Sequence, residues 1–183
     1  MGSNTVHLQI MDAHHGAAPL AQSSFKHEIQ LTHFLDEEGA ITETGLEHLL
    51  MAIKDVYRQA SNFELDDSLA FATSAIREAS NSEKILEAVR KITNIDLEVL
   101  SGEDEAKFTF LAVRRWLGWS AGDILILDIG GGSLEIAHGE QENPTSAFSV
   151  LLGASRLTRE FLYGDPYTEK SITNLKSHIK EVL

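Results

Sequence analysis

Cysteine is absent from this chain of 183 residues, and proline occurs only three times. Without cysteine the protein can form no disulfide, no thiolate metal site and no cysteine nucleophile. No apolar run approaches the roughly 18 residues that a membrane-spanning helix needs, and the first residues lack the basic-then-apolar layout of a signal peptide. These absences predict a soluble, cytoplasmic protein without a membrane partner.

Basic residues are also scarce, since 15 Lys and Arg stand against 28 Asp and Glu, a formal net charge of −13. This charge argues against nonspecific binding to nucleic acid or to an anionic membrane. A polyanionic ligand would need a local basic patch, a bridging cation or backbone amides to hold it. The preferred explanation of the charge by itself is the solubility that an acidic surface confers.

Hydrophobic periodicity predicts a mixture of strands and helices, typical of an α/β protein with partly antiparallel strand pairing. A break at residues 118–122 suggests two lobes, residues 1–120 and 121–183. Ser80 and Glu83 predict a capping box at the start of one helix. The predicted strands cover residues 6–12, 25–31, 69–73, 95–99, 124–129, 134–138 and 147–152. The predicted helices cover residues 42–61, the segment after Ser80, residues 101–117, residues 154–162 and the residues from 169 onward.

Two glycine-containing turns, Gly2–Thr5 and Gly130–Ser133, each lead into an alternating strand and align without gaps. The repeat, if it is not a chance likeness of short segments, indicates two similar lobes that present their turns to a shared cleft. Consecutive glycines allow close ligand approach and positive φ, and successive N–H groups bind anions. Neither turn has the dinucleotide fingerprint or the Walker lysine. We therefore predict phosphate-binding turns of another kind; a tight strand–strand turn is the alternative.

Acidic residues near the second turn suggest a catalytic role. Asp128 ends an apolar strand and Glu135 follows the turn, and two carboxylates beside a phosphate site are suited to Mg²⁺ or to an attacking water. Glu105 lies at the centre of a helical arc that includes Phe108 and Trp116, and an acid on an apolar face is suited to act as a general base. The alternative for Glu105 is a favourable interaction with the helix dipole.

Arg77 follows the buried strand at residues 69–73, where the clefts of α/β proteins form. Its guanidinium could clamp a phosphate bidentately, and the acidic charge of the chain makes such a group more necessary. A surface salt bridge is the alternative. The eight histidines show no metal-ligand spacing, so we interpret them as structural or surface residues.

Five motifs in this order resemble the exopolyphosphatase and guanosine pentaphosphate phosphohydrolase family: GSNT, ATSAIREA, LSGEDEAKF, DIGGGSLEI and LLGASRLTREFL. The resemblance spans essentially the whole chain. It implies a ribonuclease-H-like fold, shared with actin, sugar kinases and the heat-shock ATPase, with the active cleft between two lobes. It also implies removal of terminal phosphate from inorganic polyphosphate, or of the 5′ γ-phosphate from guanosine pentaphosphate, by water and usually with Mg²⁺. Mn²⁺ is the alternative cation.

The resemblance also implies a role for each motif residue. Glu105 matches the catalytic glutamate, and Asp128 and Glu135 match the acids of the second phosphate loop, which we expect to hold the metal. The remaining matches are expected to bind phosphate: Ser3, Asn4, Thr5, Arg77, Gly130, Gly131, Gly132 and Ser133.

The sequence departs from the family pattern at both ends. The family's first loop reads D-x-G-S-N-S/T, and Met1 stands at the x position, so the aspartate and its strand are missing. Family members also continue well beyond Leu183. We therefore expect a first lobe without its first strand and the opening of the second. Such a chain would leave the first turn without a sheet neighbour and expose apolar surface at Ile124–Ile129.

These departures affect the expected activity. We expect the 183 residues alone to hydrolyse polyphosphate poorly or not at all, and to associate through the second lobe; a homodimer stays open. Two further classes of function remain alternatives. One is a phosphotransferase of the same fold, since fold alone does not decide function. The other is a non-catalytic protein that binds phosphate or an alarmone.

Overall fold

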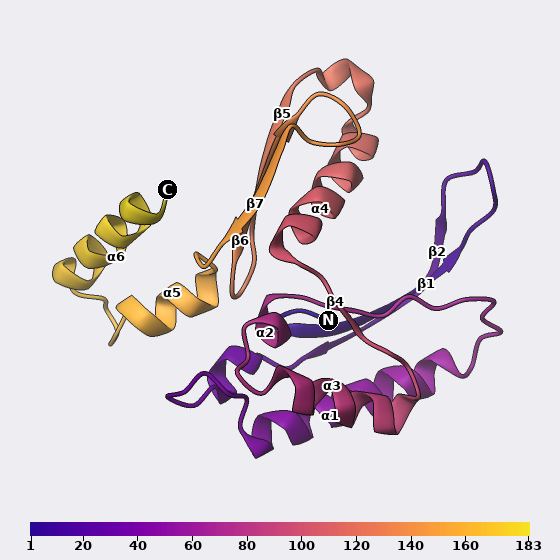
Figure 1. Cartoon of the computed structure of the whole chain (residues 1–183), viewed down its shortest axis with the longest axis horizontal. Helices are drawn as coiled ribbons and strands as arrows, with labels where there is room; N and C mark the ends of the chain where they lie inside the picture. Colours follow the sequence, from indigo (N-terminus) through magenta and orange to yellow (C-terminus); the bar gives the residue numbers. More distant parts are fainter. The chain divides into compact units, whose positions relative to one another are not determined.

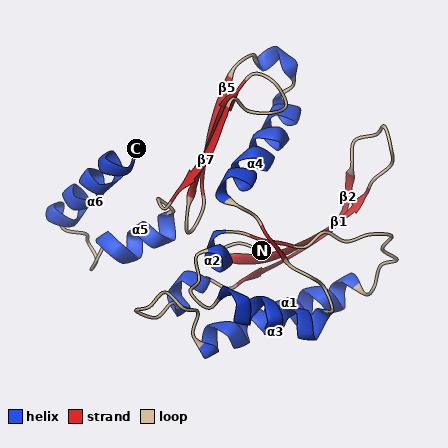
Figure 2. Ribbon diagram, in the orientation of Figure 1, coloured by secondary structure: helices blue, strands red, loops and turns tan.

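The computed structural model describes all 183 residues, which form two compact units, Met1–Val99 and Leu100–Leu183. Figures 1 and 2 show that both units combine helices and strands. The boundary precedes the predicted break at residues 118–122. The reason is that helix Gly102–Leu117 (α4) packs against the strands of the second unit and so belongs to it. No helix is long and apolar enough to cross a membrane.

The first unit contains two small sheets. In one, β1 (Thr5–Asp12) pairs antiparallel with β2 (Leu20–Glu28); in the other, β3 (Phe71–Ala72) runs parallel to β4 (Glu98–Val99). The hairpin of β1 and β2 extends beyond the helices of its unit (Figure 2). The helical elements are η1 (Leu31–Phe34), α1 (Glu43–Ala60), α2 (Ser74–Arg77) and α3 (Ser82–Thr93).

The core of the first unit forms where α1 packs against α3 and β1. The helices supply apolar residues at helical spacing, as the periodicity predicts, and the strand supplies Val6. Leu49 and Ile85 are fully buried. The predicted capping box of α3 is wrong, because Asn81 is the N-cap residue and its side chain bonds the backbone of Ile41 instead. Tertiary contact has replaced the local cap.

The second unit is built on a three-stranded antiparallel sheet in the order β5 (Ile124–Ile129), β6 (Leu134–Gly139), β7 (Ser146–Val150). The helical elements are α4, η2 (Trp119–Ala121), α5 (Ala154–Phe161) and α6 (Glu169–Val182). Figure 1 shows α4 lying along the sheet. α5 and α6 contribute to a second apolar cluster with β6, and this cluster includes Leu134, Ile136, Leu157 and Leu175.

The face of α4 that packs on the sheet differs from the predicted one. Ala106 and Phe110 are buried against Ala137, whereas Phe108 and Trp116 are 56% and 82% exposed. The sheet packs against the helical stripe that begins with the small Ala106, which lets helix and strand approach closely. The predicted arc around Glu105 is therefore not the buried face of this helix.

Arg114 extends the same buried stripe, although its side chain is charged. It is 1% exposed. Its guanidinium donates hydrogen bonds to the carbonyl oxygens of Gly118 and Gly139 at 3.4 and 3.1 Å, and also to Gly122. These bonds fix the C-terminal end of α4 to the Ile124–Gly139 end of the β5–β6 pair.

Candidate functional site

The first glycine turn is closed by a hydrogen bond from the Gly2 amide to the Thr5 carbonyl at 3.0 Å. Ser3 is buried, and its Oγ lies 3.0 Å from the Oγ of Ser74 at the start of α2. Met1 supports the turn through its backbone. Its amino group donates to the Phe71 carbonyl at 2.7 Å, and its carbonyl accepts from Thr73 at 3.0 Å. The expectation that this turn lacks a sheet neighbour is therefore wrong.

Two other predicted residues are Asn4, within this turn, and Arg77, in the first unit with it. The carbonyl of the exposed Asn4 accepts bonds from the amides of Ile29 and Gln30. Arg77 ends the short helix α2 that begins with Ser74, so the structure brings Ser3, Asn4, Thr5 and Arg77 together within the first unit. Arg77 Nε is 3.0 Å from Glu78 Oε1, and its side chain is only 18% exposed. It is thus an ion-paired residue, but not a surface one.

The second glycine turn, Gly130–Ser133, is closed in the same way, by a bond from the Gly130 amide to the Ser133 carbonyl at 2.9 Å. The repeat found in the sequence is therefore also a repeat of turn geometry. Positive φ, which the sequence led us to expect in these turns, is found at none of their residues; it occurs at five other glycines and at Gln30 and Asn94. Glycine is instead required at Gly153, because this residue packs closely against the second turn. A Cβ on Gly153 would lie 2.3 Å from Gly132 C and 2.4 Å from Ser133 N.

The carbonyl groups of the second turn are held by the start of α5. Gly130 O accepts from the Ala154 amide at 2.9 Å, and Gly131 O accepts from the Arg156 amide at 3.0 Å. In a planar trans peptide the carbonyl and the following N–H point in opposite directions. The amides of Gly131 and Gly132 therefore point away from α5. None of the hydrogen bonds within the turn uses them, so they are available to an anion.

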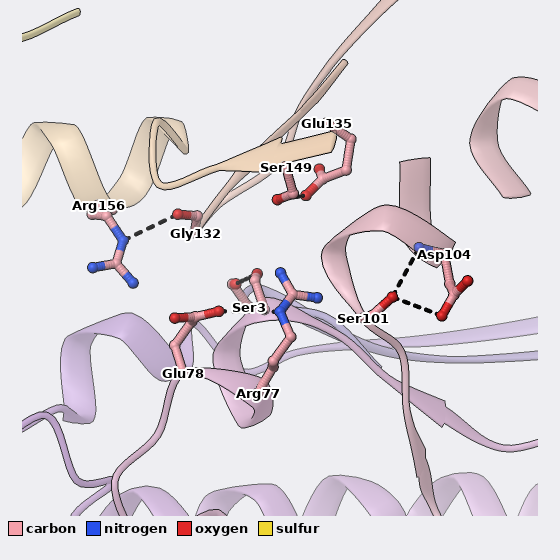
Figure 3. Close-up of polar contacts among 10 residues, drawn as sticks. Ser3, Arg77, Glu78, Ser101, Asp104, Gly132, Glu135, Ser149 and Arg156 are labelled. Atoms are coloured by element: carbon pink, nitrogen blue, oxygen red, sulfur yellow. Dashed lines mark hydrogen bonds and ion pairs between the residues drawn. The ribbon is translucent and has the colours of Figure 1, made fainter. Parts of the chain in front are cut away.

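The two acids flanking this turn face each other across neighbouring strands. Asp128 on β5 pairs with Glu135 on β6, and Glu135 pairs with Ser149 on β7. Glu135 is 3% exposed, and its Oε1 accepts a hydrogen bond from Ser149 Oγ at 2.8 Å (Figure 3). Asp128 is exposed, contrary to its expected burial, because β5 is an edge strand of this sheet; its Oδ2 lies 3.4 Å from Thr109 Oγ1.

This carboxylate pair fits a divalent cation. A buried carboxylate is costly unless hydrogen bonds or a cation compensate its charge, and one hydroxyl at Glu135 compensates little of it. Mg²⁺ commonly binds through one or two carboxylates together with substrate phosphates. Asp128 and Glu135 would supply the carboxylates, and the neighbouring turn would place the phosphate beside them.

Glu105 lies in the first turn of α4, just after the Ser101 cap. Ser101 Oγ accepts from the Asp104 amide at 3.0 Å and donates to Asp104 Oδ2 at 2.6 Å. Thr109, one turn beyond Glu105, contacts Asp128, while Arg114 near the other end of α4 bonds the far end of β6. The N-terminal end of α4 therefore points to the turn end of the sheet.

Glu105 is partly exposed at this end of α4, about one helical turn before Thr109. The structure thus brings Glu105, Asp128, Glu135 and Gly130–Ser133 to one end of the second unit. Ser149 and Arg156 also contact this group, and the sequence did not predict them. Ser149 could have been found only from the register of β6 and β7.

Comparison with known proteins identifies relatives of this chain. The chain is 49% identical over 176 residues to Exopolyphosphatase 1 of Mycobacterium tuberculosis, covering 96% of this chain and 51% of that protein. It is 27% identical over 153 residues to the guanosine-5′-triphosphate,3′-diphosphate pyrophosphatase of Aeromonas hydrophila, covering 84% and 30% of the two chains. The chain thus spans about half the length of the first of these relatives.

Solved structures of related proteins have the same fold as this chain. The crystal structure of an exopolyphosphatase from Cytophaga hutchinsonii matches all of this chain and 58% of its own, with a TM-score of 0.92 and 30% identity. This likeness confirms the α/β fold that the motifs imply. The Ppx/GppA phosphatase family model matches residues 10–183. The chain belongs to the Ppx/GppA phosphatase family.

Proposed function

We propose that this chain provides the catalytic groups of a phosphohydrolase that removes terminal phosphate from inorganic polyphosphate. The observation that carries the proposal is the grouping at one end of the second unit. Unused amides of a glycine turn, two facing carboxylates and a helix-borne glutamate lie there together. Phosphoryl transfer depends mainly on positioning and electrostatic stabilisation, and these groups are suited to both.

Each group has a distinct role in the proposal. The amides of Gly131 and Gly132 bind oxygens of the phosphate. Glu105 accepts a proton from the water that attacks the terminal phosphorus. Mg²⁺, or Mn²⁺ in its place, bound by Asp128 and Glu135 would neutralise charge on the phosphate oxygens.

Within the first unit, the proposal assigns phosphate binding to the first turn and to Arg77. Ser3, Asn4 and Thr5 present hydroxyl and amide groups, and Arg77 provides a guanidinium in an otherwise acidic chain. A guanidinium suits the bidentate recognition of phosphate. The proposal assigns the reaction to the cytoplasm, in line with a chain that has no cysteine.

Guanosine pentaphosphate is the second candidate substrate. It is favoured by the relatedness to the Aeromonas pyrophosphatase, whose name specifies a guanosine phosphate. The much higher identity to an exopolyphosphatase favours polyphosphate. Both substrates present a terminal phosphoanhydride, so the same groups would act on either.

Phosphate release from each substrate tests the proposal. The 183-residue chain and a version extended to the length of the relatives are incubated with polyphosphate or guanosine pentaphosphate, with and without Mg²⁺. We expect Mg²⁺-dependent release by the extended version, faster with polyphosphate. Phosphate transfer from ATP to an acceptor would indicate a phosphotransferase instead. Binding of either substrate without release would indicate a non-catalytic protein.

A further inference from the structure

The third carbonyl of the second glycine turn is held by a side chain. The Gly130 and Gly131 carbonyls accept backbone hydrogen bonds, but the Gly132 carbonyl accepts from Arg156 Nε at 3.1 Å (Figure 3). Because the carbonyl and the following N–H of a trans peptide point in opposite directions, this bond also orients the amide of Ser133. Arg156 therefore supports the orientation of that amide through a side-chain hydrogen bond.

Arg156 is better suited to orient the peptide unit that it bonds than to supply positive charge to a ligand. Its Nη1 lies 3.7 Å from Glu160 Oε1, and Glu160 also lies 3.6 Å from a guanidinium nitrogen of Arg159. Its side chain is 21% exposed, so it packs mostly within the protein. The donors of a guanidinium are held in one rigid plane. A bond from Nε therefore constrains the peptide unit that accepts it.

We propose that Arg156 is a positioning residue, which acts through the Gly132 carbonyl to aim the Ser133 amide at a bound phosphate. With this amide the turn presents three consecutive donors on one side instead of two. Arg156 therefore supports the turn twice. Its backbone amide donates to the Gly131 carbonyl, and its side chain donates to the Gly132 carbonyl. The inference rests on the proposed phosphate-binding role of that turn.

Three substitutions separate the hydrogen bond from the charge. Arg156→Gln places an amide nitrogen as many bonds from the backbone as Nε, so it keeps a donor and removes the charge. Arg156→Lys keeps the charge but places a methylene at that position. Arg156→Met places a methyl group there and removes both. Arg115→Met is the matched control, because Arg115 pairs with Glu142 on the surface of the same unit.

The experiment follows the backbone amides of the ¹⁵N-labelled chain by NMR while inorganic phosphate is added. In the parent, the resonances of Gly131, Gly132 and Ser133 should shift together. Loss of one hydrogen bond should weaken phosphate binding about tenfold in Arg156→Met and Arg156→Lys. Arg156→Gln should regain most of this affinity, and Arg115→Met should match the parent.

Two results would overturn different claims. Equal phosphate affinity and equal Ser133 shifts in the parent, Arg156→Met and Arg156→Lys would overturn the positioning role. A parent whose turn amides do not respond to phosphate would overturn the proposed function of the turn. In that case, spectra recorded without phosphate still test whether Arg156 orients the Ser133 amide. The Ser133 resonance should move in Arg156→Met but not in Arg156→Gln, and coincident resonances would contradict its role.

Discussion

The two glycine turns are closed by the same hydrogen bond but are supported by different neighbours. In the first turn, the carbonyls of Ser3 and Asn4 accept bonds from residues 29–31, which lead from β2 into η1. In the second, the carbonyls accept bonds from the start of α5, and two facing carboxylates stand beside the turn. The repeat thus specifies how each turn closes, whereas the surrounding elements determine what chemistry it can perform.

The turns also differ in how tightly they are packed. A Cβ on Gly153 would lie 2.3–2.5 Å from the backbone of the second turn, whereas a Cβ on Gly2 would meet only Thr73 Oγ1 at 3.8 Å. The second turn is therefore held rigidly by a neighbouring glycine. The first turn has room to adjust.

The largest expected effect follows from this difference in packing. Gly153→Val should lower the free energy of unfolding of the second unit by about 3 kcal/mol or more, because the turn or α5 must move. Gly2→Ala should change that of the first unit by less than about 1 kcal/mol. Urea unfolding measures both. Tryptophan fluorescence reports on the second unit, where Trp116 and Trp119 lie, and circular dichroism follows the whole chain.

Unfolding of Gly153→Val at the urea concentration of the parent would contradict the close packing of this turn. A large effect of Gly2→Ala would show instead that the first turn is held just as tightly.

Arg114→Met should have the next largest effect. It removes the donor for buried carbonyls at the ends of β5 and β6, and each unpaired carbonyl costs about 1–3 kcal/mol. We expect a loss of about 3 kcal/mol in the second unit, read from tryptophan fluorescence. Arg115→Met is the control, since its exposed ion pair should contribute less than about 1 kcal/mol. Equal stability of the two variants would show that the buried arginine is dispensable.

Arg114 also shows where sequence-based prediction fails. Local patterns predicted β5 to the residue and α4 to within one residue, because strand alternation and a Ser101 cap are local signals. They did not predict the burial of Arg114 or the exposure of Trp116. Which stripe of a helix is buried depends on the sheet that packs against it, and an arginine can be buried when distant carbonyls accept its hydrogen bonds.

The residues of the candidate site also differ in whether local sequence patterns predict them. The motifs identified Glu105, Asp128 and Glu135, whose grouping the structure displays at one end of the second unit. Ser149 comes from strand register, which no short motif encodes. Arg156 lies within the LLGASRLTREFL motif, but its contact with the turn depends on the packing of α5. The distribution of burial between the two acids was likewise not readable, because it depends on which strand lies at the sheet edge.

A smaller effect is expected from substitution of Asp128 or Glu135, the two acids that stand beside the second turn and not the first. Asp128→Asn and Glu135→Gln should each weaken Mg²⁺ binding in the presence of phosphate by about tenfold, since each removes one anionic ligand. Isothermal titration calorimetry measures the affinity. Asp123→Asn is the matched control, because Asp123 pairs with His138 elsewhere on the same sheet. Unchanged Mg²⁺ affinity in both variants would remove these acids from the metal site.

The smallest effect is expected in the first turn. Ser3→Ala removes the contact with Ser74 and should lower the free energy of unfolding of the first unit by about 1 kcal/mol. Urea unfolding followed by circular dichroism detects this change, and Ser68→Ala, on an exposed serine of the same unit, serves as the comparison. If Ser3→Ala is no less stable than Ser68→Ala, the contact does not secure the turn.

Turnover by Glu105→Gln tests the central claim most directly. In a version that spans the length of the relatives, Mg²⁺-dependent release of phosphate from polyphosphate is measured for this variant and its parent. We predict a loss of turnover of about 10² or more with little change in KM, because the amide keeps the shape of the glutamate but accepts no proton. Equal turnover of variant and parent would contradict the proposed role of Glu105 as the base.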